Sequence, residues 1–153
     1  MFKRILIANR GEIAVRIIRT CQELGIEAVA VYSNVDSTSL HVQLADHAVC
    51  IGPAKAADSY LNMKNILSVA TALGCDAIHP GFGFLSENST FARLVEECGI
   101  TFIGPSGDVI DMMGNKSMAR QKMIEAGVPV VPGSDGSVNT LQEAKEVANQ
   151  IGY

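Results

Sequence analysis

Short apolar runs, rich in Ile, Val and Ala, recur along the first two thirds of the chain. These runs do not alternate strictly between polar and apolar positions, which is typical of parallel strands covered by helices on both faces. We predict five strands, at Arg4–Ala8, Glu27–Tyr32, Ala48–Ile51, Asp76–His79 and Thr101–Ile103.

Stretches with the helical period of apolar positions separate these runs, at about Glu12–Leu24, Tyr60–Leu73 and Thr90–Glu97. Five times, a predicted helix ends at a glycine, the residue that most readily adopts the left-handed conformation there, and an apolar stretch follows. The alternation predicts an α/β fold, a Rossmann-like open parallel sheet over residues 1 to about 104. The five glycines are Gly25, Gly74, Gly99, Gly127 and Gly152.

The last third of the chain is richer in helical patterns. We predict a helix at about Lys116–Glu125 and a last helix that opens with Thr140 and Glu143. These two form a capping box, in which each side chain accepts from a backbone amide at the helix start. We therefore expect a first domain over residues 1–113 and the start of a second, incomplete domain over 114–153.

Charge and hydropathy exclude two classes of partner. The formal net charge is −4 and no Lys/Arg-rich stripe is present, so a nucleic-acid partner is not expected. No stretch reaches the roughly 18 uninterrupted apolar residues of a membrane span. The apolar run behind Met1 is too short for a signal peptide. We expect a cytoplasmic protein without a membrane partner.

Four widely spaced cysteines, Cys21, Cys50, Cys75 and Cys98, form no CxxC pair. We interpret them as buried, reduced thiols of a cytoplasmic protein. The three histidines are not spaced as a ligand pair, so no metal site is predicted.

The turn between the first strand and the first helix is Asn9–Glu12, which contains one glycine, Gly11. A dinucleotide-binding turn carries three glycines, which let the backbone approach a pyrophosphate. Arg10 and Glu12 would crowd that position. We interpret the segment as a structural turn.

The loop His79–Asn88 follows the fourth strand, on the side of an open α/β sheet where ligands bind. Two glycines, a proline and two phenylalanines make this loop stiff. Phe82 or Phe84 could offer a flat apolar surface, and Glu87 could accept hydrogen bonds. Alternatively, the aromatic rings cap the core, and Glu87 only precedes the next helix.

The predicted helix at Lys116 begins with Gly114-Asn115-Lys116-Ser117. A lysine there is disfavoured by the helix dipole, and an anion held between Lys116 and the helix start would relieve this. A solvated surface lysine is the alternative.

Taken together, four segments resemble the biotin carboxylase component of biotin-dependent carboxylases, in the same order and without an obvious gap over all 153 residues. They are Lys3–Ala14, His79–Asn88, Phe102–Ser106 and Gly114–Ser117. The resemblance implies that residues 1–113 are a pre-ATP-grasp domain and that 114–153 open an ATP-grasp domain.

The resemblance also implies roles. Lys116 would touch the phosphates of ATP, and Phe82, Gly83 and Glu87 would form one wall of a biotin pocket, with Phe82 where many relatives have tyrosine. The full enzyme uses ATP and Mg²⁺ to activate bicarbonate and carboxylates biotin on its carrier protein. The family's metal ligands and other catalytic groups would lie beyond Tyr153, so we expect no catalytic residue, and no activity, in this stretch alone.

The partners implied by the resemblance are the biotin carboxyl carrier protein, the carboxyltransferase subunits and a second copy of the enzyme. Arg16, Arg19 and Glu23, on the polar side of the first helix, would lie near the dimer contact. The alternative is that Arg19 and Glu23 only pair within their helix.

The start at Met1 favours the subunit of acetyl-CoA carboxylase that begins fatty acid synthesis. Three alternatives remain open. The first is that the same region begins a pyruvate or acyl-CoA carboxylase. A non-catalytic assembly module is the second alternative. A small dinucleotide-binding protein is the third, and the single Gly11 argues against it.

Overall fold

The computed structural model of the chain describes residues 2–134 and 136–152. It divides into two compact units, Met1–Ile110 and Asp111–Tyr153, and each is described by itself. The division falls within one helix, α5 (Gly107–Gly114). The domain boundary after residue 113 stays a prediction.

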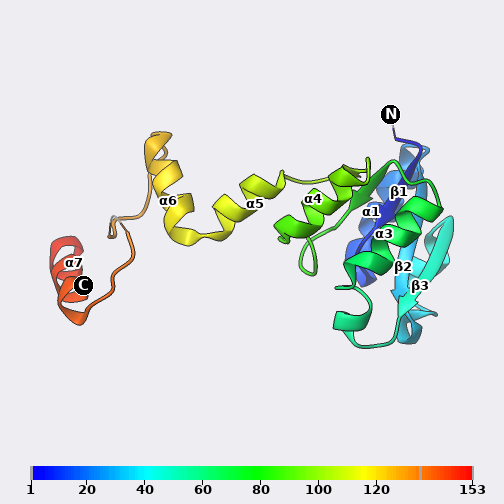
Figure 1. The fold of residues 1–153 in the computed structure, drawn as a ribbon, viewed down its shortest axis with the longest axis horizontal. Coiled ribbons are helices and arrows are strands. Elements are labelled where there is room, and N and C mark those ends of the chain that lie inside the picture. Colours follow the sequence, from blue (N-terminus) through cyan, green and yellow to red (C-terminus); the bar gives the residue numbers. More distant parts are fainter. Residues whose placement is uncertain (1, 135, 153) are drawn as a thin grey trace. The chain divides into compact units, whose positions relative to one another are not determined.

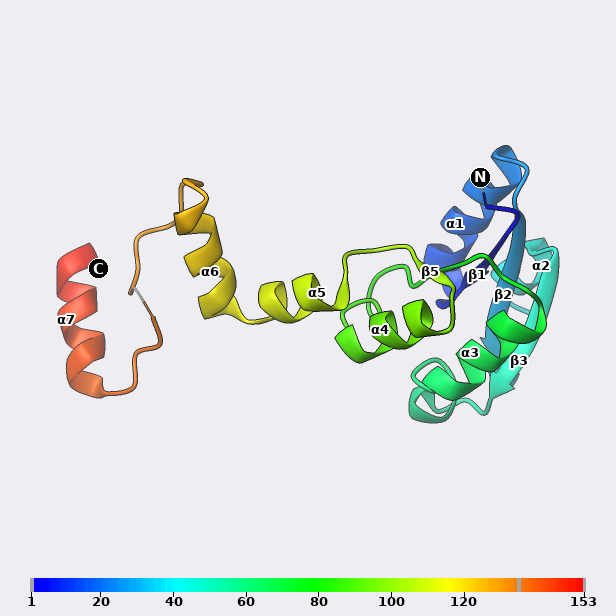
Figure 2. The ribbon, with the colours of Figure 1, turned by 45° about the horizontal axis from the view of Figure 1, so that its top comes forward.

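The first unit is built on five parallel strands (Figures 1 and 2). Their order across the sheet is β3-β2-β1-β4-β5, so β1 is central and pairs with β2 on one side and β4 on the other. All five predicted strands are confirmed, with ends that shift by one residue at most. Their bounds are Arg4–Ile7 (β1), Glu27–Ser33 (β2), His47–Gly52 (β3), Ala77–His79 (β4) and Thr101–Phe102 (β5).

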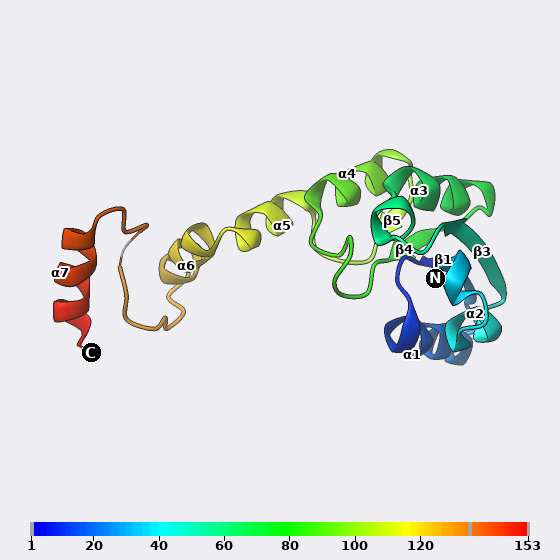
Figure 3. The same cartoon turned by 90° about the horizontal axis from the view of Figure 1, so that it is seen from below.

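Helices cover both faces of the sheet, with α1 and α2 on one side and α3 and α4 on the other (Figure 3). Successive residues of β1 contribute to the two cores: Leu6 packs with α3 and α4, whereas Ile5 and Ile7 pack with α1. The helices are Gly11–Glu23 (α1), Leu40–Leu44 (α2), Met63–Ala72 (α3) and Ser89–Glu97 (α4), and two 3₁₀ turns lie at Asn34–Asp36 and Ala56–Asp58.

The second unit contains the end of α5, α6 (Lys116–Glu125) and α7 (Leu141–Ile151). The predicted capping box is confirmed, because Thr140 accepts from the Glu143 amide and the Glu143 carboxylate accepts from the Thr140 amide. The apolar stretch after Gly127 forms no strand among the described residues from Val128 to Ser134, and none was predicted there. Pro129 and Pro132 disfavour one, because proline has no amide to donate to a ladder.

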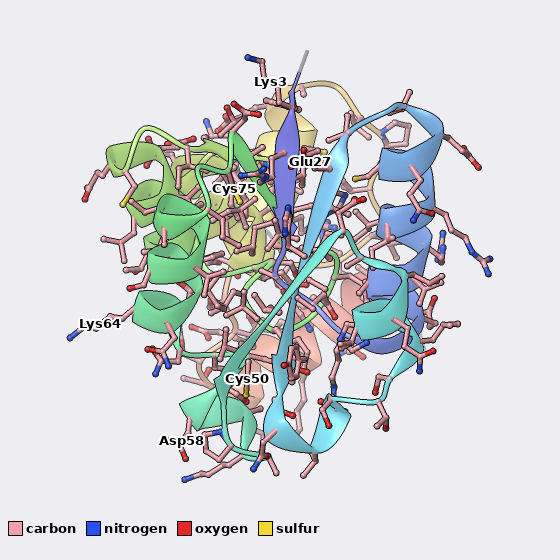
Figure 4. All side chains as sticks on the ribbon, turned by 90° about the vertical axis from the view of Figure 1, so that its right-hand side faces the viewer. Lys3, Glu27, Cys50, Asp58, Lys64 and Cys75 are labelled. Carbon is pink, nitrogen blue, oxygen red and sulfur yellow. The ribbon has the colours of Figure 1, made fainter. Side chains whose placement is uncertain are left out.

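The predicted burial of the four cysteines is half wrong. All four are free thiols, and Cys21 and Cys75 are buried, but Cys50 and Cys98 are exposed. Cys50 lies on the edge strand β3 (Figure 4), where the side chains are poorly covered, and Cys98 is the residue that ends α4.

The two units should differ in local stability. The helix α1 buries four side chains, whereas neither α6 nor α7 fully buries a described residue. Amides of β1 and β2 should therefore exchange with solvent slowly, and those of α7 rapidly, because helices without tertiary packing are marginal in water. Hydrogen exchange followed by NMR measures this difference, and equal protection in β1 and α7 would contradict it.

Candidate functional site

Asn9 lies two residues after the end of β1 and has no exposed surface. Its amide nitrogen donates to two carbonyl oxygens of the loop after β4, that of Pro80 at 2.7 Å and that of Phe82 at 2.9 Å. Its side-chain oxygen accepts from the Arg10 amide at 2.9 Å. Both donors and the acceptor of this buried group are thereby used. Asn9 thereby links the end of the central strand to the loop His79–Asn88, which we call the aromatic loop.

Gly81 allows the loop to approach α1. Its φ is +65°, and a Cβ atom there would lie 2.6 Å from Ile13 Cγ2 and 2.8 Å from Asn9 Nδ2. The Gly81 amide donates to His79 Nδ1 at 3.0 Å, so a neutral His79 ring carries its proton on Nε2. Burial lowers the pKa of His79, which favours that neutral form.

Phe84 holds an uncommon backbone conformation. Its φ of +43° is the one positive value at a non-glycine position among residues 2–134 and 136–152. The Phe84 ring stacks on Tyr60, with centroids 5.1 Å apart and planes 15° apart. The guanidinium carbon of Arg10 lies 5.5 Å from the Tyr60 ring centre and 5.6 Å from that of Phe84. This is within the range of a cation–π contact.

Asp36 completes this group of side chains. Its carboxylate accepts from the Tyr60 hydroxyl and from Ser33 Oγ, each at 2.7 Å, and lies 3.6 Å from Arg10 Nη1. Burial acts to raise the pKa of Asp36, but the bonds from Tyr60 and Ser33 and the charge of Arg10 outweigh it, so the pKa is lowered. Burial, and then the bond to Asp36, raise the pKa of Tyr60 to about 12. At neutral pH, Asp36 is therefore ionised and Tyr60 is protonated.

An open pocket of about 440 Å³ lies between the turn after β1 and the loop after β4. The structure places the predicted site residues Phe82 and Gly83 in its wall, and Phe82 is 59% exposed. Glu87 is exposed and does not line the pocket. The residues around it are Asn9, Arg10, Gly11, Glu12, Ile13, Phe82, Gly83 and Phe84.

A larger, mainly apolar groove of about 580 Å³ runs between α1 and the strands β1 and β4. Arg16 and Arg19 border it, whereas Glu23 is exposed and does not. Arg16 lies 4.0 Å from Glu12, one helical turn away. The alternative pairing of Arg19 with Glu23 is not found among the ion pairs of the described residues.

Lys116 is the first residue of α6, in the second unit. The preceding Asn115 side chain accepts from the amides of Ser117 and Met118, so these two amides are not free to bind an anion. Lys116 and Arg120 instead line a small cavity of about 160 Å³ with Ser117, Gln121, Ser134 and Gly136. The buried Nε of Arg120 has no hydrogen-bond partner within the described part of the chain. Two cationic side chains at one cavity suit an anionic ligand.

Two further features are absent from the residues that the structure describes. Among the described residues, no three His, Cys, Asp or Glu side chains gather as a metal site. No helix in that same part is both long and apolar enough to cross a membrane.

The fold and site define an α/β domain with a prepared loop at the carboxyl edge of its sheet, followed by the start of a second domain. The family model described as biotin carboxylase, N-terminal domain, matches residues 1–110. The model described as carbamoyl-phosphate synthase L chain, ATP binding domain, matches residues 115–153. The chain belongs to the biotin carboxylase family, and the predicted resemblance and fold class are confirmed.

Individual relatives agree with this assignment. The chain is 62% identical to Biotin carboxylase 1 of Bacillus subtilis over 153 residues, which are all of this chain and 34% of that protein. It is 55% identical to the 2-oxoglutarate carboxylase small subunit of Hydrogenobacter thermophilus, covering 32% of it. A crystal structure of a biotin carboxylase complex from Campylobacter jejuni matches with a TM-score of 0.93 at 48% identity, over all of this chain and 34% of that one. The chain thus spans about a third of the relatives it matches.

Two glycines of the loop offer a matched pair of substitutions. Gly81→Ala should lower the free energy of unfolding by about 2–4 kcal/mol, because it adds an overlap with Ile13 and Asn9 to the left-handed strain. Gly83→Ala, with a φ of +70° but nothing within 4 Å of its Cβ, should cost only about 1–2 kcal/mol. Urea unfolding measures both, and equal losses would contradict the close approach at Gly81.

Proposed function

We propose that this chain is the first third of a biotin carboxylase, an ATP-dependent ligase that uses bicarbonate to carboxylate biotin on its carrier protein. The observation that carries the proposal is the match of both units, in order, to one class of protein at 55–62% identity in alignments that span all 153 residues of this chain. The prepared loop at the sheet edge is the place where an α/β fold of this kind binds a ligand.

Phe82 and Gly83 form one wall of the proposed biotin pocket. The exposed Phe82 ring offers an apolar face to a bicyclic ligand, and Gly83 leaves the backbone next to it uncovered. The hydroxyl contact that a tyrosine could make at position 82 is lost. Glu87 does not line the open pocket, so its assignment to the wall has less support. A ligand would contact it only if another part of the protein completed the pocket on that side.

Lys116 is the proposed contact to the ATP phosphates, and the neighbouring Arg120 supports this assignment, because both line one cavity. Among the residues described at this cavity none is a carboxylate, the ligand that Mg²⁺ prefers together with water. As the family resemblance implies, the Mg²⁺ ligands of the proposed reaction would come from residues beyond Tyr153. One of the solved relatives, from Hydrogenobacter thermophilus, is described as a dimer with MgADP and bicarbonate.

We propose acetyl-CoA carboxylase, which begins fatty acid synthesis, as the parent enzyme, with a carrier protein, carboxyltransferase subunits and a second copy as partners. A cytoplasmic location accompanies this proposal. A pyruvate carboxylase is the second candidate, because the biotin carboxylase subunit of one is 57% identical with a TM-score of 0.86. Copurification separates the two: an acetyl-CoA-specific carboxyltransferase should accompany the parent, and a pyruvate-specific one would favour the second candidate.

A chimera tests the function directly. In it, this chain replaces the matching first third of Biotin carboxylase 1 of Bacillus subtilis. The chimera should carboxylate free biotin with bicarbonate-dependent ATP hydrolysis, and Lys116→Ala should raise the KM for ATP about 10- to 100-fold, the effect of removing a charged hydrogen bond to a phosphate. The 153-residue chain alone should show neither activity.

Three results would contradict this account. They are a well-folded chimera without turnover, a Lys116→Ala chimera with an unchanged KM for ATP, and biotin-dependent phosphate release by the isolated chain. Lys64→Ala is the matched control, because Lys64 projects from α3 of the first unit (Figure 4) and lines none of the three cavities.

Arg16, Arg19 and Glu23 are the proposed dimer contact, and the exposed side of α1 supports this. Arg19→Glu should lower the self-association of the chimera in analytical ultracentrifugation and leave its thermal midpoint nearly unchanged, because an exposed charge adds little to stability. The control Lys64→Glu reverses a charge on the opposite layer and should sediment as the parent does. Identical sedimentation of Arg19→Glu and the parent would exclude this surface.

A further inference from the structure

Four side chains form a connected group. One of them, Phe84, belongs to the aromatic loop after β4, and the other three lie outside that loop: Asp36, Arg10 and Tyr60. We propose that Arg10 is a positioning residue for biotin: it holds Phe84, and through Phe84 the adjoining Phe82-Gly83 wall, in the conformation that receives the ligand. This inference rests on the proposed function, since it assigns biotin to the pocket that this wall lines.

Phe84 is the part of the loop that needs to be held. A non-glycine residue with a φ of +43° is strained, and this conformation persists only where its surroundings enforce it. The neighbouring Leu85 is buried, which fixes the chain on one side of Phe84. On the other side, Gly83 is exposed and its Cβ direction is open, so no side-chain packing fixes it. The bond from Asn9 to the Phe82 carbonyl holds one end of the wall, and the stacked Phe84 ring is the anchor at its other end.

Arg10 is suited to hold that ring. Its guanidinium carbon is almost equally distant from the centres of the Phe84 and Tyr60 rings, at 5.6 and 5.5 Å. A planar guanidinium stacks on aromatic faces better than a compact ammonium does. The Arg10 side chain is 50% exposed, so it adds little to the hydrophobic core. It also lines the pocket beside Phe82 and Gly83. Arg10 is therefore placed to stabilise the conformation of the loop, whereas it contributes little to the hydrophobic core.

Asp36 gives Arg10 a fixed location. The lowered pKa of Asp36 keeps it ionised at neutral pH, and its two short bonds from Tyr60 and Ser33 leave the carboxylate little freedom to turn. The same carboxylate orients the Tyr60 ring on which Phe84 stacks. A single acidic residue thus positions both the cation and the second ring.

A wall held in advance strengthens binding, because the loop does not lose its freedom when the ligand arrives. Loss of Arg10 should therefore weaken biotin binding, while ATP, bound through the other unit, is unaffected. If Arg10 had only a structural role, its loss would weaken the binding of biotin and of ATP together.

The test uses Arg10→Met, Phe84→Leu and the double variant in the chimera. Arg10→Met keeps the length of the side chain and removes its charge and plane. It should raise the KM for biotin about fivefold, in the range of one cation–π contact, without changing the KM for ATP. Phe84→Leu should do the same, and the double variant should be no worse than Phe84→Leu, because both act through one contact. Lys64→Met, the matched control, should have no effect.

The inference is overturned if Arg10→Met leaves the KM for biotin unchanged, or if the effects of the two variants multiply. A fully inactive parent chimera would instead count against the proposed function. In that case, hydrogen exchange in the 153-residue chain tests whether Arg10 holds the loop in place. The Ser86 amide, bonded to the Gly83 carbonyl at 2.9 Å, should exchange about fivefold faster in Arg10→Met, with β1 and β2 unchanged. An unchanged rate at Ser86 would overturn the positioning role.

Discussion

The buried carboxamide of Asn9 is the contact on which the candidate site depends. A polar group without exposed surface costs free energy unless its hydrogen bonds are made, and Asn9 makes them to Pro80, Phe82 and Arg10. Asn9 follows the central strand, which is bonded to a neighbour on each side. The loop after β4 therefore takes its position from the most constrained part of the sheet.

The parallel topology brings these partners together. The carboxyl ends of β1 and β4 are adjacent, so the turn at Asn9 and the loop at Gly81 meet although they are far apart in the sequence. The hydrogen bonds of Asn9 fix the start of the loop, and the ring contacts of Phe84 fix its end. Between them, Phe82 and Gly83 face an open pocket, as a ligand wall should. A wall of this kind can be built before the rest of a longer protein surrounds it.

The sequence predicts most of the elements, because the strands are continuous apolar runs and the long helices have clear apolar faces. It does not predict α2, since five residues are too few for a periodic signal. It fails for Cys50, whose apolar surroundings in the sequence hide that β3 is an edge strand.

The candidate site is predictable only in part. Phe82 and Gly83 stand out, because glycines and aromatic rings gather in one loop. Asp36 and Tyr60 do not, since they lie 24 residues apart and meet Arg10 only through the fold. Arg120 was also missed, although it lies one helical turn after Lys116 in the predicted helix, and that spacing could have found it. The omissions of Asp36 and Tyr60 differ, because they are tertiary contacts between residues that carry no local signal.

The central claim is that this third of the protein prepares the loop wall without help from a ligand. Backbone NMR relaxation of Phe82, Gly83 and Phe84 in the 153-residue chain tests it most directly. The account predicts order parameters of about 0.85 at these amides, as for the rigid strand β1. Values below about 0.6 at Gly83 and Phe84, with β1 still rigid, would contradict it.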